Sequence, residues 1–355
     1  MMQSQITAEP KLFIGMDIHK KSWSVHMRTD LCDHKGFSMP ADAGKLVDYV
    51  NNHFSTHQVS LTYEAGCCGF SAARYFLNLG WQVKVVNASD VPRSDKQNYQ
   101  KTDKLDSRNL CKQLQQDQLT GIFIPTEHQE QLRSLLRQRN QVVKQLRVVK
   151  SQIKGLLLFH GIKVPDEFDN PNWSKYFLQW LADIQWSYIT GAACLKSKMR
   201  ILDVLNAEYL QTSNELRAYC RKHHNKDYYL LKSIPGIGGL LASAIIAELG
   251  DIRRFNKESE FANYIGLVPA IHQSSETDNK RGLTPRCKAL LRSYLIEAAW
   301  VAIRMDPEVQ AYYRKHVIRD TKSAIVKVAH KMCRRILSVI KTETPYQISY
   351  SLNKK

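Results

Sequence analysis

Two aspartates stand three residues apart in a segment that is otherwise basic, QKTDKLDSRNL at residues 100–110. If this segment is helical, Asp103 and Asp106 share one face of the helix. Two neighbouring carboxylates repel each other, and a cation held between them removes that repulsion. The pair therefore suggests a cation site, although by itself it is more simply explained as two acids at the start of a helix.

Two further acids close short apolar runs that are typical of strands. Asp17 ends KLFIGMD and Glu64 ends VSLTYE, in which apolar and polar residues alternate. Carboxylates at the ends of two strands can lie at a common sheet edge, and with the aspartate pair they could form a four-acid cluster. Such a cluster is tolerable only with cations, and with two Mg²⁺ ions it can perform phosphoryl transfer. Each acid alone is more simply a surface residue, so the hypothesis depends on all four.

The chain is strongly basic. Its 355 residues include 51 Lys and Arg against 33 Asp and Glu, a formal net charge of +18. This balance favours nucleic acid as a partner over an anionic membrane surface. We expect a cytoplasmic protein without a membrane partner, because we find neither an apolar run long enough to cross a bilayer nor the apolar core of a secretory signal. The eight cysteines form no CxxC pair, which argues against a zinc ribbon or a disulfide framework.

The pattern of elements changes twice along the chain. Up to about residue 125, strand-like runs alternate with helical stretches such as SAARYFLNLG, which predicts an α/β sheet layer. From residue 126, apolar residues at helical spacing with Arg and Lys on the other face predict an extended, coiled-coil-like helix. From about 230 to 345 we expect mainly helices, interrupted by a polar loop at GLVPAIHQSSETDNKRGLTP.

Two motifs in the last third of the chain could contact DNA. SIPGIGGLLASAIIAELGD at 233–251 has the pattern of a helix-hairpin-helix, in which Gly236 and Gly238 would let backbone amides approach a phosphate. A tight turn without a ligand is the alternative. In the polar loop, a serine could act as a nucleophile if a base or a metal activates it, although most serine-rich loops have no such role. Candidate phosphate contacts are Lys101, Lys104 and Arg108 beside the paired acids, and Lys280, Arg281, Arg286, Lys288 and Arg292 after the serines Ser274 and Ser275.

In their order, these motifs resemble the DEDD transposases of insertion-sequence family 110, which are similar to the Piv-type DNA invertases. GMDIHKKSWSV, YEAG, LGWQVKVVNASDVPRS and KTDKLDSRNL look like the family's acidic segments, and the run from LKSIPGIGG to KRGLT looks like its C-terminal domain. The resemblance covers nearly the whole chain. It implies a RuvC-like (RNase H-like) α/β domain at 1–125, a coiled-coil helical linker at 126–228, a mainly helical C-terminal transposase domain with the helix-hairpin-helix and the serine loop at 229–345, and a tail at 346–355.

The resemblance also implies roles for single residues. Asp17, Glu64, Asp103 and Asp106 would be the catalytic tetrad that binds Mg²⁺, with two ions per site and Mn²⁺ as a substitute. Ser274 would be the nucleophile that forms a phosphoserine link to DNA. The family's loop usually reads Ser-Ser-Gly or Gln-Ser-Gly, whereas this chain reads QSSE from residue 273, so Ser275 remains the second choice.

We therefore expect a DNA recombinase that cuts and rejoins donor and target DNA through a serine-linked intermediate. The resemblance further implies guidance by a structured noncoding RNA from the same mobile element and assembly as a dimer or tetramer. Three alternatives stay open at this point. They are a metal-dependent junction-type nuclease with water as nucleophile, a site-specific DNA invertase, and a non-catalytic nucleic-acid-binding protein.

Overall fold

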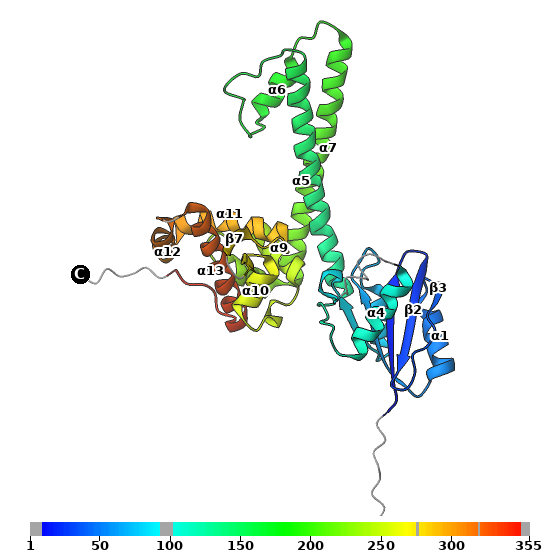
Figure 1. Cartoon of the computed structure of the whole chain (residues 1–355). Coiled ribbons are helices and arrows are strands. Elements are labelled where there is room, and N and C mark those ends of the chain that lie inside the picture. Colours follow the sequence, from blue (N-terminus) through cyan, green and yellow to red (C-terminus); the bar gives the residue numbers. More distant parts are fainter. Residues whose placement is uncertain (1–8, 93–101, 275–276, 319, 349–355) are drawn as a thin grey trace, which may run out of the picture. The chain divides into compact units, whose positions relative to one another are not determined.

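The computed structural model describes residues 9–92, 102–274, 277–318 and 320–348, apart from the side chains of residues 271–281. The chain divides into two compact units, Met1–His128 and Gln129–Lys355. The first is an α/β unit and the second is mainly helical, as the sequence predicts (Figure 1). Among the described helices, none is long and apolar enough to cross a membrane.

The first unit is built on a five-stranded mixed sheet. Its strands are β1 (Lys11–Ile18), β2 (Ser22–Thr29), β3 (Phe37–Pro40), β4 (Gln58–Glu64) and β5 (Gln82–Val86), in the spatial order β3-β2-β1-β4-β5. The first three strands form an antiparallel meander, and β4 and β5 lie parallel to β1. Because parallel strands point the same way, the carboxyl ends of β1, β4 and β5 meet at one edge of the sheet.

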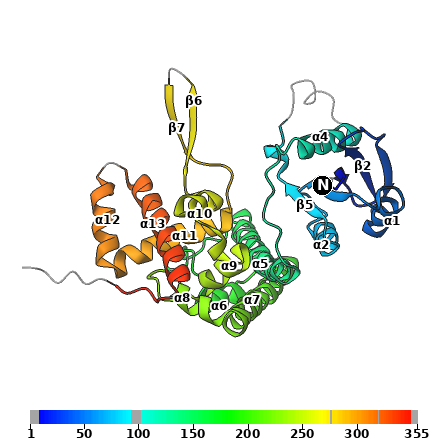
Figure 2. The same cartoon turned by 90° about the horizontal axis from the view of Figure 1, so that it is seen from below.

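Helices cover both faces of this sheet (Figure 2). The described helices of the unit are α1 (Ala43–Phe54), α2 (Ser71–Asn78), the short 3₁₀ helix η1 (Ala88–Asp90) and α4 (Asp103–Gln115). α1 and α2 pack on one face, over a core that includes Met16 and Leu61. α4 covers the other face, where Phe13 packs against the cluster of Leu110 and Leu114. Since side chains alternate along a strand, every second residue of β1 from Phe13 onward faces α4.

Gly15 allows α4 to lie directly on the backbone of β1. A Cβ atom at this position would collide with the carbonyl oxygen of Ser107 and with the backbone of Cys111, both in α4. The Cys111 thiol, whose burial raises its pKa to about 12, donates to the carbonyl oxygen of Phe13 at 3.2 Å. Gln115 Nε2 donates to the Thr29 carbonyl at 3.2 Å, which attaches the other end of the helix to β2. The position of α4, and of the acids in its first turn, thus depends on this close contact.

Gly15→Ala is expected to destabilise the first unit by about 2–3 kcal/mol, because the new methyl group overlaps backbone atoms that cannot rotate away. We expect its thermal unfolding, followed by circular dichroism, to shift down by about 5–10 °C. The matched control is Gly155→Ala, an exposed helical glycine in the second unit where a Cβ meets nothing within 4 Å. That change should stabilise its helix by up to about 1 kcal/mol. An unchanged unfolding temperature for Gly15→Ala would contradict the close packing of α4 on β1.

In the second unit, two long helices run side by side. The helices here are α5 (Glu127–Phe159), α6 (Lys175–Asp183) and α7 (Ile189–His223). Arg139 Nε lies 3.2 Å from Ser213 Oγ, and Lys198 Nζ lies 3.3 Å from Gln152 Oε1, so α5 and α7 are antiparallel. α5 is the extended helix that the apolar spacing predicts. Its buried residues facing α6 and α7 recur at steps of three or four: Val142, Leu146, Val149, Ile153 and Leu157.

The remaining helices pack around one hydrophobic core. They are α8 (Asn225–Lys232), α9 (Gly239–Leu249), the 3₁₀ helix η2 (Ile252–Arg254), α10 (Glu258–Ile265), α11 (Ala289–Met305), α12 (Pro307–Val317) and α13 (Thr321–Thr342). α9 is buried from Leu241 to Leu249. Tyr346, assigned from the sequence to a tail, is anchored to this body, since its backbone N–H donates to Ser233 Oγ at 2.8 Å and its hydroxyl to Asp306 Oδ2 at 2.7 Å.

The segment expected to be a polar loop is a β-hairpin, which corrects the sequence-based prediction of its shape. β6 (Pro269–Ser274) pairs antiparallel with β7 (Thr277–Leu283), and Ser274 pairs with Thr277 at the end of the ladder. Figure 2 shows the two strands projecting from the helices of their own unit. The polar residues that suggested a loop lie instead on the two paired strands.

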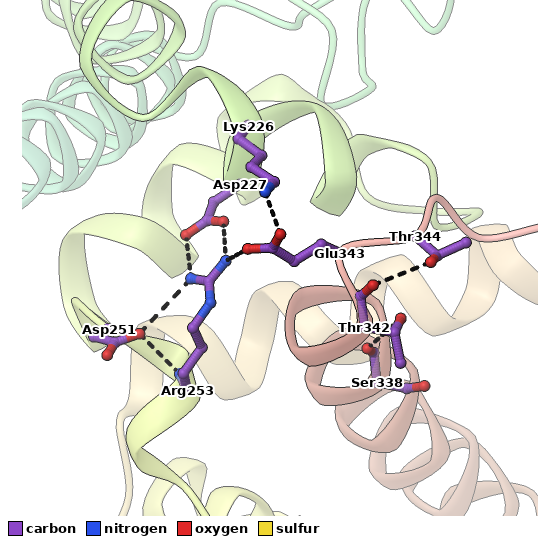
Figure 3. A network of polar contacts seen from close by, with 8 residues as sticks. All are labelled: Lys226, Asp227, Asp251, Arg253, Ser338, Thr342, Glu343 and Thr344. Carbon is purple, nitrogen blue, oxygen red and sulfur yellow. Dashed lines mark hydrogen bonds and ion pairs between the residues drawn. The ribbon is translucent and has the colours of Figure 1, made fainter.

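Arg253 ties three elements of the helical body together (Figure 3). Its guanidinium donates to both carboxylate oxygens of Asp227 in α8, at 2.8 and 2.9 Å, and to Glu343 at the end of α13, at 3.3 Å. Lys226 Nζ also contacts Glu343. The hydrogen bonds that Arg253 donates to Asp227 are the largest effect on the pKa of Arg253 and raise it above its usual value. This network therefore fixes the ends of α8 and α13 against η2.

Candidate metal and nucleic-acid site

Asp17 and Glu64 lie at the carboxyl ends of two neighbouring parallel strands. The register pairs Met16 of β1 with Tyr63 of β4, so the next residues along each strand are the two acids. Met16 and Tyr63 are buried on the α1 and α2 side. By alternation, Asp17 and Glu64 face the opposite side of the sheet, which α4 covers.

Asp103 and Asp106 form the acidic first turn of α4. Thr102 is the N-cap, and its side chain accepts a hydrogen bond from the backbone N–H of Leu105. The positive end of the helix dipole stabilises two carboxylates at this position. The helix begins beside the edge where β1 ends, so the paired acids lie over the strand-end acids.

The other three acids affect the pKa of Asp17. Burial raises the pKa of Asp17; His19 partly opposes this, and the negative charges of Asp103, Asp106 and Glu64 raise the pKa further. A carboxyl that must ionise among three others favours a bound cation. The other three acids singled out in the sequence therefore lie within electrostatic reach of Asp17.

His19 is a member of this cluster that the sequence analysis missed. Its Nε2 atom lies 3.3 Å from Asp17 Oδ2 and 3.4 Å from Asp103 Oδ2. The signal was present, because His19 is two residues beyond Asp17 and an extended chain places such residues on one side. Among the residues that the structure describes, Asp17, His19 and Asp103 are the group whose possible metal-ligand atoms all lie within 4.8 Å of one another.

These three side chains fit one small divalent ion. Two ligands that each lie about 2.1 Å from an octahedral ion are about 3 Å apart when adjacent and about 4.2 Å apart when opposite. The distances of 3.3 and 3.4 Å from the imidazole to the two carboxylates are close to the first value. Glu64 and Asp106 lie outside this tight group, although their negative charges raise the pKa of Asp17.

The predicted phosphate contacts in the first unit have different surroundings. Lys104 is exposed in the first turn of α4, whereas Lys101 lies outside the described residues. Arg108 is paired with Asp33, with 3.0 Å between NH2 and Oδ2, and the other Asp33 oxygen is 2.6 Å from His26 Nε2. Arg108 thus braces α4 against the end of β2, a structural role that the sequence could not indicate.

Several predicted contacts in the second unit also have structural partners. Gly236 has a φ of +87°, and a Cβ there would collide with the Ala298 carbonyl oxygen, so the turn itself requires glycine. Gly238 is exposed at the start of α9, with open space around it. Arg292 donates to the carbonyls of Gly266 and Thr284 at 3.2 and 2.8 Å, which closes the base of the hairpin.

The other predicted residues of this unit lie on or beside the hairpin. Lys288 Nζ lies 5.2 Å from the centre of the Tyr264 ring, and Arg286 is exposed. Lys280 and Arg281 belong to β7, where the structure describes the backbone but not their side chains. Ser274 is the last residue of β6, and Ser275 lies outside the described residues.

Comparison with known proteins defines the class of protein. A transposase family model matches residues 14–161, which include the four acids and His19, and the model of the transposase IS116/IS110/IS902 family matches residues 228–314. This chain is therefore a transposase, an enzyme of DNA cleavage and strand transfer. It belongs to the IS110 family of insertion-sequence transposases.

Three curated relatives, all transposases by name, align with this chain over most of their length. The putative transposase y4qE of Sinorhizobium fredii is 25% identical over 91% of this chain and 80% of its own. The transposase for insertion sequence element IS1111A of Coxiella burnetii is 26% identical over 85% of this chain and 83% of its own. The transposase for insertion sequence element IS1328 of Yersinia enterocolitica is 24% identical over 81% and 83%.

Proposed function

We propose that this transposase cuts and rejoins DNA strands through a phosphoserine intermediate, with divalent metal ions held by Asp17, Glu64, Asp103 and Asp106. The observation that carries the proposal is the convergence of four acids and His19 at one sheet edge beneath the start of α4. The chain as a whole has a net charge of +18, so a group of acids at this place runs against its overall charge. Its chemistry fits metal-assisted phosphoryl transfer.

Two Mg²⁺ ions, which Mn²⁺ can replace, would polarise the scissile phosphate and lower the pKa of the attacking hydroxyl. The acidic side chains of the protein would hold these ions. Asp17 and Asp103 hold one position together, and Glu64 and Asp106 extend the site along the sheet edge. The paired acids lie in the first turn of α4, at the positive end of the helix dipole.

Ser274 is the proposed nucleophile, with Ser275 as the second choice. Its Oγ–P bond forms as the bond from phosphorus to one deoxyribose oxygen breaks, and that oxygen leaves with a proton. A deoxyribose hydroxyl of the partner strand then attacks the same phosphorus and releases the serine. The number of phosphodiester bonds is unchanged, so the strands are rejoined without ATP. The reaction requires a serine on the β6–β7 hairpin to reach the acids of the same or another subunit.

Exposed cations and backbone amides would position the nucleic acids. Lys104 lies beside the paired acids, and Arg286 lies beside the hairpin. The amides at the start of α9, next to Gly238, can approach a phosphate as in a helix-hairpin-helix. We further propose donor and target DNA and a structured noncoding guide RNA as partners, a homodimer or tetramer as the working form, and the cytoplasm as the site of action, because the substrate is DNA.

The order of the elements supports different roles for successive parts of the chain. Residues 1–125 would form a RuvC-like catalytic domain, because the mixed sheet has three meander strands followed by two parallel ones. Residues 126–228 would be a coiled-coil linker, and residues 229–345 the domain that carries the helix-hairpin-helix and the serine. Residues 346–355 would be a tail, attached at Tyr346 to the helical body.

Sequencing the RNA that copurifies with the full chain tests the guided part of this proposal. We expect one RNA species that contains segments complementary to the DNA on both sides of the element and to the insertion site. Adding it to purified protein, donor duplex, target duplex and Mg²⁺ should produce joined products, and scrambling the complementary segments should remove them. Joined products that form equally well without RNA would contradict RNA guidance and favour an invertase that recognises its site by protein contacts alone.

A further inference from the structure

One nitrogen ligand stands in a cluster otherwise made of carboxylates. We propose that His19 is a direct metal ligand that makes this site prefer transition-metal ions over Mg²⁺. The inference rests on the proposed metal site and adds a fifth side chain and a selectivity to it. It concerns which ion the protein retains, rather than whether an ion is needed.

The geometry places the imidazole within ligand distance of two carboxylates, those of Asp17 and Asp103. His19 Nε2 lies 3.3 Å from Asp17 Oδ2 and 3.4 Å from Asp103 Oδ2, which suits neighbouring ligands on one ion. The His19 side chain is 52% exposed and that of Asp103 is 61% exposed. An ion can therefore enter from solvent and keep water on its remaining positions.

A short turn fixes the backbone at His19. His19 is the first residue after β1, and its N–H donates to the carbonyl of Ser22, the first residue of β2, at 3.2 Å. The strands resume pairing at once, with Ile18 opposite Trp23. This short turn fixes the backbone of His19 close to Asp17, so the imidazole is attached at a defined point beside the carboxylates.

The ligand chemistry then sets the preference among ions. Mg²⁺ binds oxygen almost exclusively and keeps much of its water. Imidazole favours later transition metals, and affinities for divalent ions rise from Mn²⁺ to Co²⁺ for a given mixed site. Replacing one oxygen ligand with an imidazole should therefore leave Mg²⁺ binding nearly unchanged while strengthening Mn²⁺ binding, and strengthening Co²⁺ binding more.

His19→Gln separates this ligand role from a purely electrostatic one. Glutamine can place an amide oxygen near the position of Nε2, so the site keeps its shape but loses its nitrogen. The control is His53→Gln, a histidine exposed on α1, which packs on the opposite face of the sheet, with Nδ1 2.8 Å from the Tyr49 carbonyl. It tests adventitious ion binding by the chain's other histidines.

The experiment is a calorimetric titration of the full chain, without nucleic acid, with Mg²⁺, Mn²⁺ and Co²⁺. For His19→Gln we expect the affinity to fall about tenfold or more for Co²⁺, about threefold to tenfold for Mn²⁺ and less than about twofold for Mg²⁺. The electron spin-echo modulation of bound Mn²⁺ should contain a nitrogen-14 signal that disappears in His19→Gln and persists in His53→Gln.

Two results would overturn the inference. Equal weakening of all three ions would assign His19 a structural or electrostatic role, and unchanged affinities with an unchanged nitrogen signal would remove it from the site. Asp17→Asn distinguishes the inference from the proposal it rests on. If that variant loses all three ions while His19→Gln has no effect, the metal site stands and only the selectivity fails; if Asp17→Asn binds all three normally, both fail.

Discussion

Asp17→Asn is expected to reduce DNA cleavage and strand joining by at least about a thousandfold, which corresponds to about 4 kcal/mol of transition-state stabilisation. The substitution keeps the size of the side chain and removes the charge that the other acids and the imidazole surround. Since the ions are the proposed source of activation, a site that cannot hold them loses the chemical step. Cleavage of a labelled donor duplex in Mg²⁺, with and without excess chelator, measures the effect.

Whereas Asp17→Asn should lower activity, it should leave the stability of the folded chain unchanged or raise it. Burial first, and then the negative charges of Asp103, Asp106 and Glu64, raise the pKa of Asp17, although His19 opposes them. A raised carboxyl pKa means that ionisation is less favourable in the folded chain than in the unfolded chain, so near neutral pH the charge opposes folding. Without metal, the variant should unfold at the same temperature as the parent or higher.

A loss of activity without a loss of stability distinguishes a functional residue from a structural one. Asp30→Asn, at an exposed aspartate just after β2 in the same unit, is the matched control and should retain full cleavage. If Asp17→Asn cleaves DNA at a rate close to the parent, the carboxylate cluster is not the catalytic site. A loss of activity accompanied by a large loss of stability would point instead to a folding defect.

Ser274→Ala is expected to abolish the covalent protein–DNA adduct and to lower strand joining by at least about a thousandfold. The substitution removes the attacking oxygen and leaves the backbone pairing of β6 with β7 in place, because Ser274 contributes to that ladder through its main chain. DNA binding should be nearly unchanged. Denaturing electrophoresis of labelled DNA after a short reaction reveals the adduct, and proteolysis with mass spectrometry identifies the modified serine.

Ser275→Ala is the matched control for this experiment. This variant should retain the adduct, because the proposed attacking oxygen is that of Ser274. An adduct that survives in Ser274→Ala but disappears in Ser275→Ala would transfer the role to Ser275. Cleavage that continues in both variants without any adduct would instead identify water as the nucleophile and favour the junction-type nuclease.

Part of the candidate site could be predicted from local pattern. The apolar run KLFIGMD and the alternation along VSLTYE placed Asp17 and Glu64 at strand ends, and the three-residue step placed Asp103 and Asp106 on one helical turn. Such patterns are readable because a strand has a period of two and a helix one of 3.6, and each period separates a buried side from an exposed one.

Other assignments depended on partners that are distant in sequence. Arg108 looked like a free cation beside the paired acids, but Asp33, 75 residues earlier, holds it. Arg292 looked like a phosphate contact, but the carbonyls of Gly266 and Thr284 accept its hydrogen bonds. The spacing of His19 from Asp17 is visible in the sequence, but its contact with Asp103 is not, because those two residues are far apart along the chain.

By itself, the sequence determined the family, the α/β character of the first unit, the long helix from Glu127 and the identity of four acids. Those properties follow from residue type and short-range periodicity, which burial converts directly into local structure. Only the tertiary structure decided that β1 lies between β2 and β4, that Gly15 admits α4 onto the sheet, that a polar segment pairs as a hairpin and that His19 joins the acids. Each of these depends on which surfaces meet after the chain has folded, and local periodicity carries no information about that.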